Sequence, residues 1–575
     1  MPAKRSRPGS SERPGTPNDQ TDDFSQLTTR LTASIAEAAS TATFATRAAK
    51  AAKATARHAK VDRAAHTAAT DDARTASATA QTSRAAKVGQ TAQSGKATGQ
   101  TGKARTSRVS RSSNGAWGGV TPSLTGAEIR ERFLSFFERQ GHLRMPSSSL
   151  VSRDPTVLFT VAGMQQMIPF FLGQEQPPGK RLTTAQKVYR TIDIDEVGDS
   201  SHLTFFEMLG NFSVGDYFKR EAITFAWELL TQGYGIPAGR LFPTVHPDDD
   251  EAPGLWQEIA GIPDAEITRL SDNWWGPPGD RGPCGPDSEI YFDRGAEYGC
   301  GRADCAPGCE HCDRYLEIWN LVFMQYYQDA DGQRMPLKQP NIDTGMGLER
   351  LASVLQGKES VYDTDLFRTI IDAVARLSGV AYGENPAHDR ALRVIADHGR
   401  GLTFLAGDGV LPGNSGRSYV FRRVLRRAAL FGRRLGLEGA FLGDVANAVI
   451  DLMGSHYIEL VARRDQIVEV LTLEERRFNK TLTTGLQLLT RELDELARTE
   501  KREVPGRLAF RLYDTHGFPL ELTEEIAQER GMTVDRAGYD SAMLEQRGRA
   551  REQKPFVRER EEEAWTQLSK GLPAT

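Results

Sequence analysis

The chain has 575 residues, 39% of them hydrophobic and 26% charged, which is the composition of a globular protein with several domains. No apolar run reaches the roughly 18 residues of a membrane span, and the N-terminus lacks the apolar segment of a secretory signal. We therefore expect a cytoplasmic protein without membrane contact. Five cysteines are too few for a disulfide framework.

The first 120 residues differ from the rest in charge. They carry 19 Lys and Arg against 8 Asp and Glu, although the net charge of the whole chain is −4. Their Ala, Thr, Ser, Gln, Gly, Lys and Arg bury too little apolar surface to offset the entropy of ordering. We predict a disordered extension over 1–120 that attracts nucleic acid phosphates. The alternative is a solvated extension without a role.

A domain of mixed helices and strands is predicted over 121–361. Thr125 stands three residues before Glu128, a capping-box pattern that predicts a helix ending near Gly141. A second helix is predicted over 218–233. Short runs typical of strands occupy 156–160, 187–191, 204–208, 289–292 and 315–327. This order indicates an α+β fold.

A mostly helical domain is predicted over 362–553, followed by a charged linker over 554–575. Apolar residues recur at helical spacing over 364–379, 387–405, 419–435, 441–463 and 464–500. We find no internal repeat.

Two motifs in the first domain indicate a nucleotide site. A polar loop joins Arg190 to "HLTFFEML", and a hairpin of this shape places Arg190 beside Phe206 and Glu207. Further on, "NIDTGMGLERL" supplies Asp343, a glycine-rich turn and Arg350. An aromatic face for the base and cations for the phosphates predict ATP binding without a P-loop.

These motifs resemble the class II aminoacyl-tRNA synthetases, and among them the alanyl-tRNA synthetases. The resemblance is carried by "SSSLVSRDPTVLFTVAGMQQM", "HLTFFEMLGNFSVGDYFKREAITFAWELL", "DTGMGLERL", "RVIADH", "FRRVLRRA" and "RLYDTHGFP", and it covers about residues 124–551. It implies an antiparallel-sheet catalytic domain followed by a helical tRNA-recognition domain. It also implies ATP and Mg²⁺ as cofactors, and L-alanine and tRNA(Ala) as partners.

The resemblance assigns roles to individual residues. Arg190, Asp343 and Arg350 would be catalytic, with Arg190 on the α-phosphate of ATP and Arg350 on its γ-phosphate. The implied ATP-binding residues are Arg190, His202, Phe206, Glu207, Gly347 and Arg350. The implied alanine-binding residues are Trp275, Asn320, Asp343 and Gly345.

A pocket for alanine discriminates poorly against glycine and serine, because one methylene contributes only about 1–3 kcal/mol. The family corrects such errors in an editing module that would follow Thr575. We therefore expect this chain to mischarge serine and glycine, to rely on a separate editing protein, and to be a monomer without the family's C-terminal oligomerisation region.

A cysteine cluster lies within the first domain. Cys300, Cys305, Cys309 and Cys312 have the spacing C-x4-C-x3-C-x2-C inside an insertion over 299–313. Four thiolates in a cytoplasmic protein suit a tetrahedral structural zinc ion. An insertion loop with free thiols is the alternative.

The segment 419–435 carries a row of arginines. Arg422 and Arg426, like Arg423 and Arg427, are four residues apart, which lays them along one side of a helix. We predict that these four arginines bind tRNA. In the family, an Asn and an Asp at the positions of Asn414 and Asp514 read the acceptor-stem G·U pair.

The sequence thus predicts the adenylation and tRNA-recognition unit of such a synthetase, which activates alanine with ATP and transfers it to the 3′ end of tRNA. One alternative is an enzyme that loads alanine onto another acceptor. A second is a catalytically silent nucleic-acid-binding protein.

Overall fold

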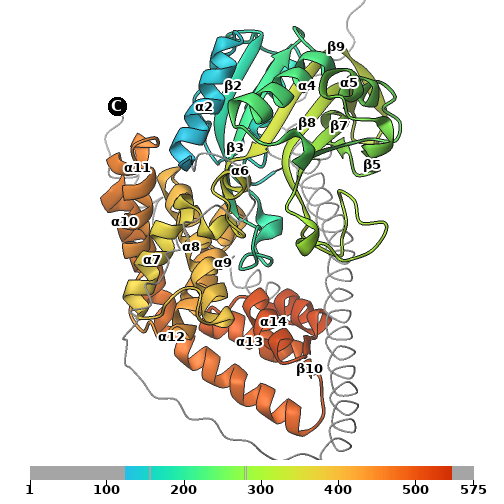
Figure 1. The fold of residues 1–575 in the computed structure, drawn as a ribbon. Coiled ribbons are helices and arrows are strands. Elements are labelled where there is room, and N and C mark those ends of the chain that lie inside the picture. The colour runs from blue at the N-terminus through green and yellow to red at the C-terminus, as the bar shows by residue number, and fades with distance from the viewer. Residues whose placement is uncertain (1–123, 155–156, 278, 280, 547–575) are drawn as a thin grey trace, which may run out of the picture. The chain divides into compact units, whose positions relative to one another are not determined.

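The computed structural model describes residues 124–154, 157–277, 279 and 281–546. The predicted extension over 1–120 and the linker over 554–575 lie outside the described residues. The described chain forms a nine-stranded sheet that is followed in sequence by a set of helices (Figure 1). In the segments that the structure describes, every helix is too short or too polar to cross a membrane.

The sheet has the strand order β1-β2-β3-β9-β8-β7-β4-β5, with β6 paired to β7. Neighbours from β2 to β4 along this order are antiparallel, and only β1 on β2 and β5 on β4 pair in parallel. The predicted α+β class is confirmed. The strands are β1 (Leu143–Arg144), β2 (Arg181–Tyr189), β3 (Phe205–Val214), β4 (Leu241–Val245), β5 (Thr268–Arg269), β6 (Trp274–Trp275), β7 (Gly282–Asp293), β8 (Tyr315–Gln328) and β9 (Arg334–Gly347).

Most predicted strands are parts of these longer ones, but two predictions differ. The described part of the run at 156–160, residues 157–160, forms only an isolated bridge, between Val151 and Phe159. The predicted glycine-rich turn at Asp343 is the end of strand β9, which pairs with β3 and β8 on its two sides. A Cβ on Gly345 would lie 2.8 Å from Met208 Sδ. The glycine therefore serves the close packing of a central strand rather than a turn.

One face of the sheet is covered by α2 (Gly126–Arg139), α4 (Lys219–Glu228) and α5 (Glu251–Ala260) (Figure 1). Thr125 caps α2, and its capping box with Glu128 is confirmed. Phe133 and Phe137 of α2 pack against Trp319 of β8, with ring centroids 5.6 and 6.4 Å apart. The short helix α3 (Ile168–Phe171) precedes β2, and α6 (Leu348–Leu355) continues directly from β9.

The remaining helices follow α6 in sequence. The predicted helix over 441–463 is broken after Met453, where Tyr457 turns its side chain inward to Glu207. The helices are α7 (Asp365–Ser378), α8 (Pro386–Gly407), α9 (Gly416–Arg434), α10 (Leu442–Met453), α11 (Ile458–Ala462), α12 (Arg464–Arg498), α13 (Gly506–His516) and α14 (Leu520–Glu529), with a parallel pair β10 (Glu503–Val504) and β11 (Thr533–Val534).

The hydrophobic core does not divide at the predicted domain boundary, between residues 361 and 362. One cluster of buried side chains runs from Leu124 to Leu471 and includes residues of the sheet and of α7, α8 and α10. A second cluster joins the later part of α12 to α13 and α14. The first helices of the helical part therefore share a core with the sheet.

Candidate functional site

A cavity of about 250 Å³ lies over strands β3, β7, β8 and β9 and is closed on one side by the loop between β2 and β3. Nine of the ten predicted ATP- and alanine-binding residues line this cavity. They are Arg190, His202, Phe206, Trp275, Asn320, Asp343, Gly345, Gly347 and Arg350. Residues separated by up to 160 positions are thus brought to one site.

One end of the cavity combines an aromatic ring with two arginines. The guanidinium carbon of Arg190 lies 5.1 Å from the centroid of the Phe206 ring, and its Nε donates a hydrogen bond to the carbonyl of Val161 at 3.2 Å. Arg350, in the first turn of α6, donates from Nη1 to Glu317 Oε2 at 3.0 Å. An adenine ring and a chain of phosphates need these partners.

His202 lies at the same end and is oriented by Asp199. One Asp199 oxygen accepts from the backbone N–H of His202 at 2.8 Å, while the other contacts His202 Nδ1. The hydrogen bond to Asp199 raises the pKa of His202 above its usual value. The imidazole is therefore held closer to its cationic form, which favours contact with an anion.

Glu207 is the one predicted ATP-binding residue that the structure does not bring to the cavity. Alternate residues of a strand face opposite sides of a sheet, so Phe206 and Met208 face the cavity while Glu207 faces away from it. Its buried carboxylate accepts from Arg130 at 2.6 and 2.8 Å and from the Tyr457 hydroxyl at 2.7 Å. Burial acts to raise the pKa of Glu207, but the charge of Arg130 outweighs it and the pKa is about 2. Glu207 is a structural residue.

The other end of the cavity combines an apolar wall with one buried carboxylate. Trp275 of β6 packs with Met208 and Val322 to form an apolar wall. Asp343 is only 5% exposed, and burial, with the charge of nearby Asp287, raises its pKa to about 8. A small ligand with an ammonium group and a short apolar side chain fits this combination.

Asn320 of β8 adds a second polar group at this end. Its Nδ2 donates to Glu289 Oε1 at 3.2 Å, whereas its buried Oδ1 has no hydrogen-bond partner among the described residues. Buried polar atoms are nearly always paired, so an unpaired oxygen on a residue that lines the cavity is unusual.

The sequence prediction missed four carboxylates of the cavity, Asp193, Glu289, Glu317 and Glu349. The pKa of Glu289 is raised to about 8, first by burial and then by the charge of Glu317. Glu289 lies opposite Asn320 on the neighbouring strand β7. Alternation within the predicted strands gives the face of each residue but not the register between β7 and β8 that pairs Glu289 with Asn320. Glu317 follows a register shift between β7 and β8, which alternation alone does not reveal.

Comparison with known proteins shows the family of the chain. The family model described as tRNA synthetases class II (A) matches residues 128–571. The chain belongs to this family of class II tRNA synthetases. An alanine–tRNA ligase of Dehalococcoides mccartyi is 54% identical over 433 residues, and one of Carboxydothermus hydrogenoformans is 53% identical over 434. Each match covers 75% of this chain and 49% of the relative, so the chain spans about half the length of the curated relatives it matches.

Among solved structures, a pyrrolysyl-tRNA synthetase of Desulfitobacterium hafniense is 12% identical, with a TM-score of 0.25 over 42% of this chain and 72% of that chain. At that score the likeness gives no information about the site.

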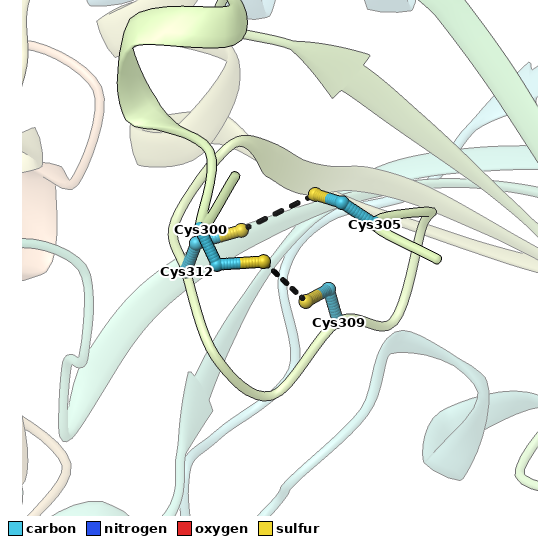
Figure 2. A group of neighbouring side chains, drawn as sticks. All are labelled: Cys300, Cys305, Cys309 and Cys312. Atoms are coloured by element: carbon cyan, nitrogen blue, oxygen red, sulfur yellow. Dashed lines mark hydrogen bonds between the residues drawn. The ribbon is translucent and has the colours of Figure 1, made fainter. Parts of the chain in front are cut away.

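The cysteine cluster of this class II synthetase lies in the loop between β7 and β8 (Figure 2). The four Sγ atoms of Cys300, Cys305, Cys309 and Cys312 all lie within 4.8 Å of one another. Sulfur pairs are 3.8 Å apart for Cys300–Cys309 and 3.6 Å apart for Cys305–Cys312. Ligands around a zinc ion at about 2.3 Å per Zn–S bond are separated by similar distances, so the four thiols fit a tetrahedral ion.

The arginines of α9 are engaged with carboxylates of the same chain. Arg427 is buried and donates to both oxygens of Glu525 at 3.0 Å. Arg423 is buried and pairs with Asp195 at 2.6 Å. Neither guanidinium is available to an RNA phosphate, so the prediction that Arg423 and Arg427 bind tRNA does not fit their placement. Helical spacing located the row of arginines, but it could not show that two of them face inward.

Arg422 and Arg426 are half-buried and connect two loops. Both bind Glu474 of α12, at 2.8 and 3.1 Å, and Arg422 also contacts the side chain of Asn414. Arg426 contacts the carbonyl of Gly517, just after α13. Asn414 and Asp514 themselves are exposed. Of the predicted G·U-reading residues, Asn414 therefore lies on the loop before α9 and Asp514 in the last turn of α13, and Arg422 and Arg426 connect these two regions through Glu474.

Proposed function

We propose that the chain is the adenylation and tRNA-recognition part of an alanine–tRNA ligase. The observation that carries the proposal is one cavity with Arg190, Phe206 and Arg350 at one end and Asp343 beside Trp275 at the other. The first set suits ATP, and the second suits an amino acid with a small side chain. The 54% identity to a protein of that name supports it.

The proposed chemistry is positioning and charge neutralisation. A carboxylate oxygen of alanine attacks the α-phosphorus of ATP, a P–O bond forms, and the bond to the leaving pyrophosphate breaks. Arg190 neutralises the charge that develops on the α-phosphate, while Phe206 stacks on adenine. Arg350 and His202 bind the outer phosphates. Asp343 and the Oδ1 atom of Asn320 hold the ammonium group of alanine.

Mg²⁺ is the metal that such chemistry needs, and the cavity has carboxylates that fit it. Glu289 and Glu317 face the same space, and their mutual repulsion contributes to the raised pKa of Glu289. A divalent cation between the two carboxylates and the phosphates of ATP would relieve this repulsion. We propose Glu289 and Glu317 as its protein ligands.

In the second step, the 3′-terminal ribose hydroxyl of tRNA attacks the carbonyl of the adenylate and displaces AMP. We propose that Asn414 and Asp514 read the G·U pair of the acceptor stem, because Asp accepts from the exposed guanine amino group and Asn can both donate and accept. Their exposure, on the loop before α9 and in the last turn of α13, supports this role, and Arg422 and Arg426 connect these two regions.

We also propose that the four clustered cysteines hold one structural zinc ion. Their four sulfur atoms already lie within 4.8 Å of one another, close to the separations around a tetrahedral zinc ion. The cluster is separate from the cavity, whose lining includes none of the four. The ion would stabilise the insertion over 299–313 rather than take part in adenylation.

Alanine-dependent exchange of pyrophosphate into ATP tests the proposed function. The unchanged protein is expected to catalyse exchange, and Arg190→Ala to lower it at least about a hundredfold, the usual effect of removing one charge-stabilising donor. Arg181→Ala is the matched control, since Arg181 begins the strand that ends directly before Arg190 but pairs with Asp216 outside the cavity. Equal exchange in the Arg190 variant and the control would contradict the site assignment.

A further inference from the structure

The loop between β2 and β3 has two sides with different neighbours. On its inner side, Asp193, Ser201, His202 and Leu203 line the cavity. On its outer side, the loop lies against α8, α9 and the segment 360–362 that precedes α7. The wall of the cavity is therefore supported by helices of the predicted tRNA-recognition half.

Four backbone carbonyls of the loop accept hydrogen bonds from α8, α9 and the segment 360–362. Residues 197, 199, 200 and 202 are held in this way, so the path of the chain is fixed at almost every second residue. The bonds are Arg427 Nη2 to Val197 at 3.3 Å, Arg393 Nη1 to Asp199 at 3.2 Å, Ser360 Oγ and Val361 N to Ser200 at 2.9 and 3.1 Å, and Tyr362 Oη to His202 at 2.8 Å.

Two further contacts tighten the loop against α8. Gly198 has a φ of +122°, and a Cβ there would lie 2.9 Å from Arg390 Cγ, so the backbone approaches the helix closely. At the end of the loop, Asp397 accepts from Thr204 N at 2.9 Å and from its hydroxyl at 2.5 Å. The loop is thus anchored directly before the strand that carries Phe206.

One ion pair joins a side chain of the loop to α9. Arg423 of α9 pairs with Asp195, which lies in the middle of the loop. The Nη2–Oδ1 distance is 2.6 Å. The side chain of Arg423 is 7% exposed, whereas that of Asp195 is 68% exposed. A buried arginine that reaches out to an exposed loop carboxylate contributes little to the core through that contact. Its effect falls on the position of the loop.

We infer that Arg423 is a positioning residue for ATP: with Asp195, it fixes the β2–β3 loop so that His202 faces the phosphates. This inference rests on the proposed function. One arginine of the row that the sequence predicted to bind tRNA thus has a role in the adenylation step. Arg423 touches no substrate, and it acts through the loop.

The pair is tested with Asp195→Ala, Arg423→Gln and the double variant in the full chain. Each single change is expected to raise the KM for ATP in pyrophosphate exchange about fivefold, the upper range for one solvent-facing ion pair. The double variant should be no worse than Arg423→Gln alone, because that variant has already lost the contact with Asp195. Arg423 also lies 3.7 Å from Glu521, so Arg423→Gln removes a second pairing that Asp195→Ala leaves in place. The KM for alanine should stay unchanged, since Trp275 and Asp343 lie at the other end of the cavity.

Arg434→Gln is the matched control. Arg434 also lies on α9 and pairs with a carboxylate, Glu529, at 2.7 Å, but it does not touch the loop. Amide hydrogen exchange provides a readout that is independent of activity. Residues 191–203 should exchange faster in Asp195→Ala and Arg423→Gln, and at the unchanged rate in Arg434→Gln.

The outcomes separate the inference from the proposed function. No alanine-dependent exchange in the unchanged protein would overturn both. Normal activity with an unchanged KM for ATP in Asp195→Ala would overturn the inference alone, whether or not the loop amides exchange faster. An equal rise in the KM for alanine would also overturn it, because the effect would then be a general loss of structure.

Discussion

Asp343 is the residue whose ionisation should govern alanine affinity. Burial and the charge of Asp287 raise its pKa to about 8, and the pKa of Asp287 itself is raised to about 7 by burial. An ammonium group binds the ionised carboxylate. At pH values below the pKa of Asp343, alanine binding must therefore displace the proton of the Asp343 carboxyl group. We expect the KM for alanine to fall as the pH rises from about 6.5 to about 8.5, by at most tenfold per unit.

The measurement is the KM for alanine in pyrophosphate exchange across this range. Asp343→Asn carries no titrating group and should bind alanine weakly, with a flatter pH profile. A KM that stays constant across the range in the unchanged protein would contradict the role of Asp343.

Glu207 should matter for stability rather than for ATP binding. Glu207→Gln removes the charge that neutralises buried Arg130, and breaking a buried pair from one side costs about 3–5 kcal/mol. We expect a lower urea midpoint, measured by equilibrium unfolding. Glu131→Gln is the control, because its pair with Arg144 is largely exposed and should cost less than about 1 kcal/mol. A large rise in the KM for ATP at unchanged stability would restore Glu207 to the nucleotide site.

At the scale of an element, the loop between β7 and β8 should depend on metal. We expect about one zinc ion per chain by elemental analysis, lost when both Cys309 and Cys312 are changed to Ser. The melting temperature should fall while the rate of pyrophosphate exchange is largely kept, since the cluster is separate from the cavity. Cys284→Ala is the control, because Cys284 is buried in β7 and should leave the zinc content unchanged. A metal-free chain with normal stability would make the cluster an ordinary loop.

The loop that carries Asn414 and the end of α13 that carries Asp514 should act only in the transfer step. Asn414→Ala and Asp514→Ala are expected to leave pyrophosphate exchange unchanged and to slow charging of a tRNA(Ala) transcript. The preference for a G·U over a G·C pair at the recognised position should also shrink, since each base contact is worth about 1–3 kcal/mol. The check is the charging rate of the two transcripts. An undiminished preference would place recognition elsewhere.

At the scale of the whole molecule, the basic residues 1–120 should contribute charge rather than chemistry. A shortened chain that begins at Gly119 is expected to exchange pyrophosphate as well as the full chain. Its affinity for tRNA should fall at low salt and match that of the full chain at high salt, because contacts with phosphates weaken as salt is added. Binding titrations at two salt concentrations test this. Loss of exchange on shortening would show that the extension supports the adenylation site.

The sequence by itself determined the elements and most of the cavity. The capping box predicted α2, and four of the strand-like runs predicted parts of β2, β3, β7 and β8, because local hydrogen bonding and the alternation of apolar residues depend on neighbouring positions. Arg190, Phe206, Asp343 and Arg350 could be named because their motifs are short and specific.

Only the tertiary structure decided which side of an element meets which neighbour. Glu207 lies between two cavity-facing residues yet faces Arg130, 77 positions away. The arginines of α9 form one row in the sequence, but Arg423 turns to a loop of the cavity while Arg422 turns to Asn414. Such partners are chosen by packing between segments far apart in the chain, and periodicity within one segment carries no information about them.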